Sequence, residues 1–170
     1  RQRQMCIRDS LKTIVLTMPI KQLENQHDLS LKHQNWLVKN FANVEAHTIS
    51  LDKLFETFSL TLNKFDNEHG FANSRARLRM TTLYQVAAAN KGIVVGTGNK
   101  VEDFGVGFYT KFGDGGVDIS PIADCNKTEV WELGKELGIL KEIIDAPPTD
   151  GLWDDGRTDE GQLGFSYNEL

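Results

Sequence analysis

Three features of the sequence predict an α/β fold in which a parallel sheet carries helices on both faces. Ile93, Val94 and Val95 form a run of β-branched residues bounded by glycines, which is typical of a buried parallel strand. Strand-like and helix-like segments follow one another in the order strand, helix, strand, helix, helix, strand, helix. A glycine-rich segment comes directly after residue 95, at the position where open α/β sheets bind their ligands.

The first half of the chain supplies two of the predicted strands and the helix between them. Residues 13–17 have the composition of a strand, which Pro19 closes. Residues 28–41 place apolar side chains near helical spacing, so we predict a helix there. Residues 44–51 alternate weakly and are predicted to form the second strand.

Two more helices are expected before the strand at 93–95. Asp52 is expected to cap a helix that runs to about residue 62. The clearest helix covers residues 71–91, because apolar residues recur there at helical spacing and Gly92 follows. The residues of this apolar stripe are Ala76, Met80, Leu83 and Ala87.

The last predicted helix begins at residues 126–128. Its inward-facing residues are expected to be Val130, Leu133 and Leu137, and Gly138 is expected to end it. Beyond this helix, two prolines and an acidic stretch over 150–160 indicate a long loop.

Both ends of the chain depart from the pattern. Residues 1–10 show neither a strand period nor a helix period, so we predict that they are a non-native scar. One domain is expected to span residues 11–170. Because the sequence stops at Leu170 without a closing signal, we expect this domain to be a fragment.

Composition excludes several classes of function. The formal charge is −5, from 24 acidic and 19 basic side chains, which argues against a nucleic-acid-binding surface. No apolar run reaches the roughly 18 residues that a membrane span needs. Two cysteines provide neither a disulfide framework nor metal-ligand spacing, so a cytoplasmic setting is expected.

Arg77, on the 71–91 helix, is the first candidate binding residue. At about 100° per residue, Arg75 and Arg79 lie close together around the helix, whereas Arg77 lies on the other flank. Asn73 precedes Arg77 by four residues and shares that flank. An amide beside a guanidinium can hold a phosphate or a ribose. A solvated basic face is the alternative, and the sequence leaves both open.

Glu102 and Lys127 are candidates for binding a metal and an anion. Glu102 lies where the segment after the 93–95 strand could already be turning into a helix. A lone carboxylate beside a triphosphate is typical of magnesium, which takes one or two protein carboxylates plus phosphate oxygens. Lys127 opens a helix, where backbone N–H groups already favour anions. Taken singly, each could instead be a solvated surface residue.

The remaining candidates lie in loops. The glycine-rich loop that contains Lys111, Asp114 and Asp118 could close over a site. Thr149 follows two prolines that stiffen its approach. Solvated loop side chains are again the alternative.

Taken in order, these segments resemble ammonia-dependent NAD synthetase. The similarity extends over about residues 11–170, and the part from Asn73 to Trp153 is the most specific. The matching motifs are residues 73–84 (NSRARLRMTTLY), 96–118 (GTGNKVEDFGVGFYTKFGDGGVD), 120–122 (SPI), 126–127 (NK) and 147–153 (PPTDGLW).

The resemblance implies a fold and a reaction. The fold is the adenine-nucleotide α-hydrolase-like (Rossmann-like) sheet of the ATP pyrophosphatases, and the family works as a homodimer. The implied reaction is that of a ligase. ATP, as co-substrate with Mg²⁺, adenylates the nicotinate carboxylate of deamido-NAD and releases pyrophosphate. Ammonia then attacks the acyl-adenylate, which gives NAD and AMP.

The family's functional residues can be transferred motif by motif. Asp114, in the closing loop, could receive or orient ammonia; this is an inference from its position and is not carried by the family pattern. The resemblance implies deamido-NAD binding by Arg77, Lys111 and Asp118, ATP binding by Thr97, Lys127 and Thr149, and magnesium ligation by Glu102.

Two parts of the family pattern are missing from the sequence. They are the phosphate loop Ser-Gly-Gly-x-Asp-Ser, which should precede the strand at 13–17, and a C-terminal His-Lys pair. We therefore expect the fragment alone to be inactive. Two other interpretations stay open: the synthetase half of a glutamine-dependent enzyme, and a catalytically dead nucleotide-binding or dimerisation module.

Overall fold

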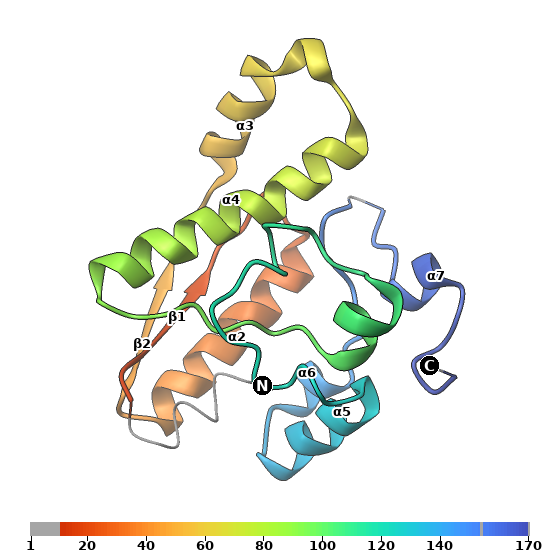
Figure 1. Cartoon of the computed structure of the whole chain (residues 1–170). Helices are drawn as coiled ribbons and strands as arrows, with labels where there is room; N and C mark the ends of the chain where they lie inside the picture. Colours follow the sequence, from red (N-terminus) through yellow and green to blue (C-terminus); the bar gives the residue numbers. More distant parts are fainter. Residues whose placement is uncertain (1–10, 154, 170) are drawn as a thin grey trace.

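The computed structural model describes residues 11–153 and 155–169 (Figure 1). The predicted scar at residues 1–10 lies outside the described residues. The elements are β1 (Thr13–Thr17), α2 (Glu24–Asn40), β2 (Val44–Thr48), α3 (Asp52–Thr61), a 3₁₀ turn (Asn63–Phe65), α4 (Glu68–Ala89), a π-helical turn (Val101–Val106), α5 (Lys127–Glu136), α6 (Lys141–Ile144) and α7 (Asp159–Leu163).

Strands β1 and β2 form a parallel pair joined through α2. Their register aligns Thr13 with Val44 and Thr17 with Thr48, as predicted for the first two strands. Leu37 of α2 packs on Val15 and Val44, which makes one buried cluster on this face. Helix α2 begins at Glu24, earlier than expected, because its polar first turn carries no apolar period to reveal it.

Helix α3 starts where it was predicted, but the capping assignment is wrong. Asp52 is the first helical residue and Leu51 occupies the cap position. The Asp52 carboxylate instead accepts hydrogen bonds from the backbone N–H of Lys21 and the hydroxyl of Ser50, which fastens the chain after β1 to the start of α3. A second buried cluster forms here from Ile20, Leu51 and Phe55, with Met18, Ile49, Phe71 and Leu78 packed against it.

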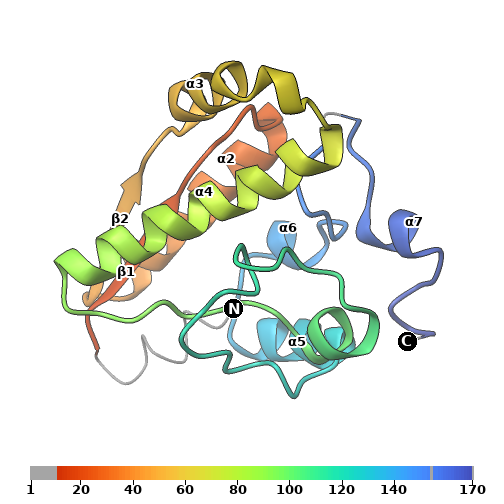
Figure 2. The ribbon, with the colours of Figure 1, turned by 45° about the horizontal axis from the view of Figure 1, so that its top comes forward.

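The long helix α4 lies across the strand pair on the side opposite α2 (Figures 1 and 2). This arrangement confirms the predicted sheet with helices on both faces. The Asn67 side chain caps α4 by accepting from Gly70 N at 2.7 Å. Met80 is buried, and the other residues of the predicted stripe are at least partly buried. No helix of the described residues is both long and apolar enough to cross a bilayer.

The predicted strand at 93–95 is reduced to a single bridge. Val95 pairs in parallel with Ile119, and Gly96 N donates to the carbonyl of Ile119 at 2.8 Å. Ile93 is 59% exposed, so the run of β-branched residues is only half buried. Within the described residues this segment has one neighbouring segment to pair with, and a regular central strand needs two.

The C-terminal third consists of short helices joined by loops. A capping box between Asn126 and Glu129 starts α5. Gly138 follows α5 with φ of 68°, as the prediction required. Val130 is buried, but the inward assignment of Leu133 is wrong, because this side chain is 43% exposed and Gly134 occupies the buried position.

Candidate functional site

Glu102 and Lys127 form the most enclosed ion pair of the described residues. Lys127 Nζ lies 2.6 Å from Glu102 Oε1, and the two side chains are 17% and 15% exposed. The π-helical turn positions Glu102, and the first turn of α5 positions Lys127. The Tyr167 hydroxyl donates to the same Oε1 atom at 2.8 Å. A candidate metal ligand and a candidate phosphate ligand therefore face one another.

The three predicted ATP ligands line one cavity. Thr97, Lys127 and Thr149 come from three separate segments and surround a space of about 340 Å³, the Lys127 cavity. Apolar side chains of α2, α5 and α6 form much of its wall, including Leu29, Val130 and Ile143. A polar rim on an apolar cavity is typical of small-molecule sites.

A larger cavity lies at the carboxyl end of β1, which is the edge where parallel sheets bind ligands. This Met18 cavity measures about 670 Å³ and shares Thr149 with the Lys127 cavity. Its polar lining includes Gln22, Gln26 and Ser30 of the β1–α2 region. These residues were not predicted, although the end of the 13–17 strand marked their position.

Asp114 lines a third cavity of about 400 Å³, the Asp114 cavity, which shares Thr97 with the Lys127 cavity. Asp114 as a whole residue is exposed, but its carboxylate accepts from the backbone N–H of Thr110 at 2.9 Å. Desolvation raises the pKa of Asp114, and the negative charges of Glu102 and Asp150 add to this effect. A carboxyl with a raised pKa is suited to exchanging a proton with a reacting group.

The predicted deamido-NAD ligands lie outside this cavity group. Arg77 Nε donates to the backbone carbonyl of Lys111 at 3.1 Å, so these two residues are brought together on an exposed turn. Gly113 packs tightly against α4, since a Cβ atom there would lie 2.9 Å from the Cβ of Ala76. Asp118 accepts from Val94 N at 2.7 Å and from the Tyr84 hydroxyl at 3.1 Å, which ties it to the 93–95 segment.

The three α4 arginines contact three different segments. Arg75 Nη1 donates to the carbonyl of Leu152 at 2.9 Å, and Arg79 Nε donates to that of Met18 at 3.0 Å. Burial, reinforced by the charge of Arg75, lowers the pKa of Arg79. Arg77 is exposed, whereas Arg75 and Arg79 are partly buried. The predicted difference between Arg77 and its two neighbours is confirmed in its geometry.

This geometry predicts two separable kinds of defect. Arg77→Ala should raise the KM for deamido-NAD, the substrate that the resemblance implies, about tenfold, which corresponds to about 1.4 kcal/mol. Arg79→Ala should leave the Met18 carbonyl without its donor and lower the free energy of unfolding by about 1–3 kcal/mol. Steady-state kinetics and urea unfolding of both variants check this. An Arg77→Ala protein that loses as much stability as Arg79→Ala would contradict it.

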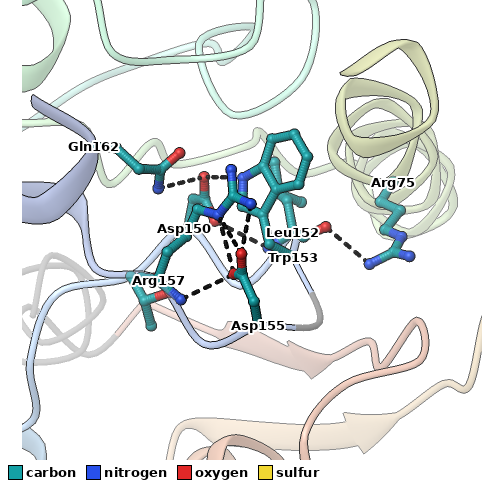
Figure 3. A network of polar contacts seen from close by, with 8 residues as sticks. Arg75, Asp150, Leu152, Trp153, Asp155, Arg157 and Gln162 are labelled. Atoms are coloured by element: carbon teal, nitrogen blue, oxygen red, sulfur yellow. Dashed lines mark hydrogen bonds and ion pairs between the residues drawn. The ribbon is translucent and has the colours of Figure 1, made fainter. Parts of the chain in front are cut away.

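Side chains between residues 150 and 162 form a network of polar contacts (Figure 3). Asp150 Oδ2 accepts from Trp153 Nε1 at 3.2 Å and from Gln162 Nε2 at 3.3 Å. The Arg157 guanidinium lies 4.1 Å from the centroid of the Trp153 ring and pairs with Asp155. The Arg75 contact with Leu152 attaches this network to α4. Thr149 itself donates to the carbonyl of Arg157 at 3.0 Å.

Asp159 is a buried carboxyl that the sequence did not reveal as part of the site. It is 6% exposed, and its Oδ2 atom lies 3.4 Å from the Tyr167 hydroxyl. Burial raises its pKa from 3.8 to about 6; Lys127 opposes this shift, and Glu102 and Asp150 add to it. The residue opens the first turn of α7, inside the stretch over 150–160 that the sequence predicted as a long acidic loop.

Because the folded-state pKa of Asp159 is raised, the folded protein holds its proton more tightly than the unfolded chain does. Asp159 therefore costs stability as pH rises from about 4 to 6, by up to about 3 kcal/mol, and the cost persists above pH 6. We expect Asp159→Asn to increase the free energy of unfolding at pH 8 but not at pH 4. Urea unfolding at both pH values measures this, and an equal change at the two values would contradict it.

The side chains at this site could hold magnesium only together with the phosphate oxygens of a bound nucleotide. Among residues 11–153 and 155–169, no group of three or more His, Cys, Asp or Glu side chains could hold a metal ion by itself. Glu102 nevertheless offers one hard carboxylate beside Lys127. One protein carboxylate suffices where phosphate oxygens and water complete the coordination.

Comparison with known proteins decides the family. The sequence model of the NAD synthase family matches residues 4–170, which is nearly the whole chain. The chain belongs to the NAD synthase family. This membership confirms the resemblance carried by the motifs between Asn73 and Trp153.

Curated relatives of this NAD synthase chain are NH₃-dependent NAD(+) synthetases. The protein from Carboxydothermus hydrogenoformans is 42% identical over 138 residues, covering 79% of this chain and 56% of the relative. The protein from Alkaliphilus oremlandii is 54% identical over 99 residues, covering 58% and 39%. The chain thus spans about half the length of the curated relatives it matches.

Solved structures of the family share the fold. An NMN synthetase from Francisella tularensis has 36% identity and a TM-score of 0.90, covering 99% of this chain and 68% of that protein. An NH₃-dependent NAD synthetase from Campylobacter jejuni has 28% identity and a TM-score of 0.67, covering 77% and 55%. These likenesses confirm the expected Rossmann-like class.

Proposed function

We propose that the full-length protein, meaning the natural gene product that contains this chain, amidates deamido-NAD with ammonia. ATP is consumed, and NAD, AMP and pyrophosphate are formed. The observation that carries the proposal is the convergence of Thr97, Lys127 and Thr149 on one cavity, with Glu102 paired to Lys127. The curated relatives named above support the same reaction.

The shared lining residues suggest how ATP would lie. The nucleoside would occupy the Met18 cavity, and the phosphates would pass Thr149 toward Thr97 and Lys127. On binding, Lys127 would exchange its Glu102 partner for phosphate oxygens. Glu102 would then hold Mg²⁺, which when bound neutralises triphosphate charge.

The Asp114 cavity would receive the nicotinate end of deamido-NAD, because it meets the Lys127 cavity at Thr97. The nicotinate carboxylate oxygen would form a bond to the α-phosphorus of ATP while the bond to pyrophosphate breaks. Ammonia would then bond to the acyl carbon, AMP would leave, and the nitrogen would lose one proton. Asp114 would accept that proton, and the raised pKa of its carboxyl supports this role. Arg77, Lys111 and Asp118 would hold the remainder of the dinucleotide.

A mononucleotide acceptor is the second candidate. The solved structure with a TM-score of 0.90 over 99% of this chain is an NMN synthetase. Amidation of nicotinate mononucleotide would use the same carboxylate chemistry, and only the contacts beyond the pyridine nucleoside would differ.

The test is product analysis with the purified full-length protein. ATP, Mg²⁺ and ammonia are supplied with deamido-NAD or with nicotinate mononucleotide, and AMP, NAD and NMN are measured. NAD formation at the higher kcat/KM supports the proposal, and NMN formation at the higher value supports the second candidate. A parallel reaction with glutamine in place of ammonia tests the glutamine-dependent alternative, which predicts product formation from glutamine. No AMP from either acceptor would refute both amidations and favour a catalytically dead module.

We also propose a cytoplasmic homodimer. Leu60 is 68% exposed and Phe65 is 79% exposed, at the end of α3 and in the turn that follows it. Large exposed apolar side chains grouped in this way are typical of a subunit interface. Multi-angle light scattering of the full-length protein tests the dimer, and a monomer at micromolar concentration would contradict it.

A further inference from the structure

Tyr167 is the most buried tyrosine of the described residues, and it contacts both members of the Glu102–Lys127 ion pair. It is 3% exposed and lies near the end of the chain, far in sequence from both Glu102 and Lys127. Its ring packs edge-on against Trp131 of α5, with 5.9 Å between centroids, and Lys127 Nζ lies 5.0 Å from its own centroid. The ring is therefore fixed on the helix that carries Lys127.

The hydroxyl of Tyr167 lies between two carboxylates. It is 2.8 Å from Glu102 Oε1 and 3.4 Å from Asp159 Oδ2. A phenol has one proton to donate, and the shorter distance identifies Glu102 as the acceptor. Asp159 Oδ1 is buried without a hydrogen-bond partner among the described residues. The Glu102 carboxylate thus has two donors, Lys127 and Tyr167, on the same oxygen.

These two donors behave differently when a nucleotide binds. Lys127 carries the charge that triphosphate oxygens attract, so under the proposed function it would leave Glu102 for the ligand. Tyr167 cannot follow, because Trp131 and the surrounding residues hold its buried ring in place. Its hydroxyl would therefore remain the protein donor on Glu102 Oε1 once Lys127 has moved to the phosphates.

We infer that Tyr167 is a positioning residue that holds Glu102 in its cation-binding orientation after Lys127 has turned to phosphate. The inference rests on the proposed use of Mg²⁺ and ATP. A hydrogen bond to an ionised carboxylate orients it and limits its side-chain freedom, so less of that freedom is lost when a cation binds. Tyr167 touches neither substrate nor metal in this arrangement.

The test measures ATP binding to the full-length protein by isothermal titration calorimetry over a series of Mg²⁺ concentrations. Tyr167→Phe removes the hydroxyl and keeps the ring that packs on Trp131. We expect the Mg²⁺ concentration for half-maximal enhancement of ATP binding to rise about tenfold, the effect of losing one hydrogen bond to a charged group. ATP binding without Mg²⁺ should stay unchanged. Ser166→Ala, which removes the neighbouring hydroxyl bonded to Glu169, is the matched control.

A double-mutant cycle separates positioning from a general structural effect. In a Glu102→Gln background, Tyr167→Phe should have no further effect on the Mg²⁺ dependence. A Tyr167→Phe variant that weakens ATP binding equally with and without Mg²⁺, or as strongly in the Glu102→Gln background, would overturn the inference while the proposed function stands. Absence of any Mg²⁺-dependent ATP binding by the unmodified protein would overturn both.

Discussion

Replacing Lys127 by alanine is expected to lower the rate of adenylation by at least about 10²-fold, the loss that follows removal of one fixed donor from a site of developing charge. Lys127 is 17% exposed and lies in the cavity that contains Thr97 and Thr149. Its removal would take away the cation that we propose for one side of the triphosphate. Pyrophosphate release and ATP titration of the full-length variant measure the effect.

The same substitution should also destabilise the fold, and this must be separated from the catalytic defect. Without Lys127, the 15% exposed Glu102 carboxylate keeps only its Tyr167 donor, at a cost of about 2–3 kcal/mol. Adding Glu102→Gln to Lys127→Ala should restore much of the stability but none of the ATP binding. Lys135→Ala, on the exposed last turn of α5, is the control for charge alone. A stable Lys127→Ala protein with normal pyrophosphate release would contradict the assignment.

Residues 11–170 alone are expected to show no measurable adenylation. Thr97, Lys127 and Thr149 supply one side of a triphosphate site, and the family's phosphate loop would supply the other. Losing a single fixed donor lowers rates about 10²–10³-fold, so losing a loop of donors should remove activity below detection. β1 pairs only with β2 among the described residues, so we also expect an exposed strand edge and aggregation.

The measurement compares residues 11–170 with the full-length protein under the same conditions. Pyrophosphate release reports catalysis, and light scattering reports association. If residues 11–170 turn over ATP near the rate of the full-length protein, the triphosphate site needs no donors beyond those in this segment, and the prediction is wrong.

Local patterns in the sequence predicted the helices better than the third strand. The period of the 71–91 segment located α4 within three residues of either end, because the stripe that contains Met80 does face the core. The 93–95 segment has the composition of a strand, but a strand also needs neighbouring segments to pair with. Among the described residues, only the segment at Ile119 pairs with it. Composition cannot supply a neighbouring strand.

The sequence predicted the site residues that lie in recognisable motifs, and it missed those that join the site only through tertiary contacts. Glu102 and Lys127 stand out in the sequence by their positions at helix starts, and the structure brings them within 2.6 Å. Asp159 and Tyr167 give no such signal, since a carboxyl in an acidic stretch and a single aromatic residue are ordinary surface patterns. Only tertiary contacts make them part of the site: Tyr167 packs against Trp131 and bonds to Glu102, and the Asp159 carboxylate lies beside the Tyr167 hydroxyl.

Helix α4 makes local opening of the site a concerted event. Arg75, Arg77 and Arg79 bond to carbonyls at Leu152, Lys111 and Met18, which lie in three segments well separated in sequence. A rigid helix that tilts to release one carbonyl must strain the other two contacts. Amide hydrogens in the three segments should therefore exchange with solvent at correlated rates, slowing together when either nucleotide is bound. A ligand bound in one cavity would in this way also slow hydrogen exchange in the segments that line the neighbouring cavity.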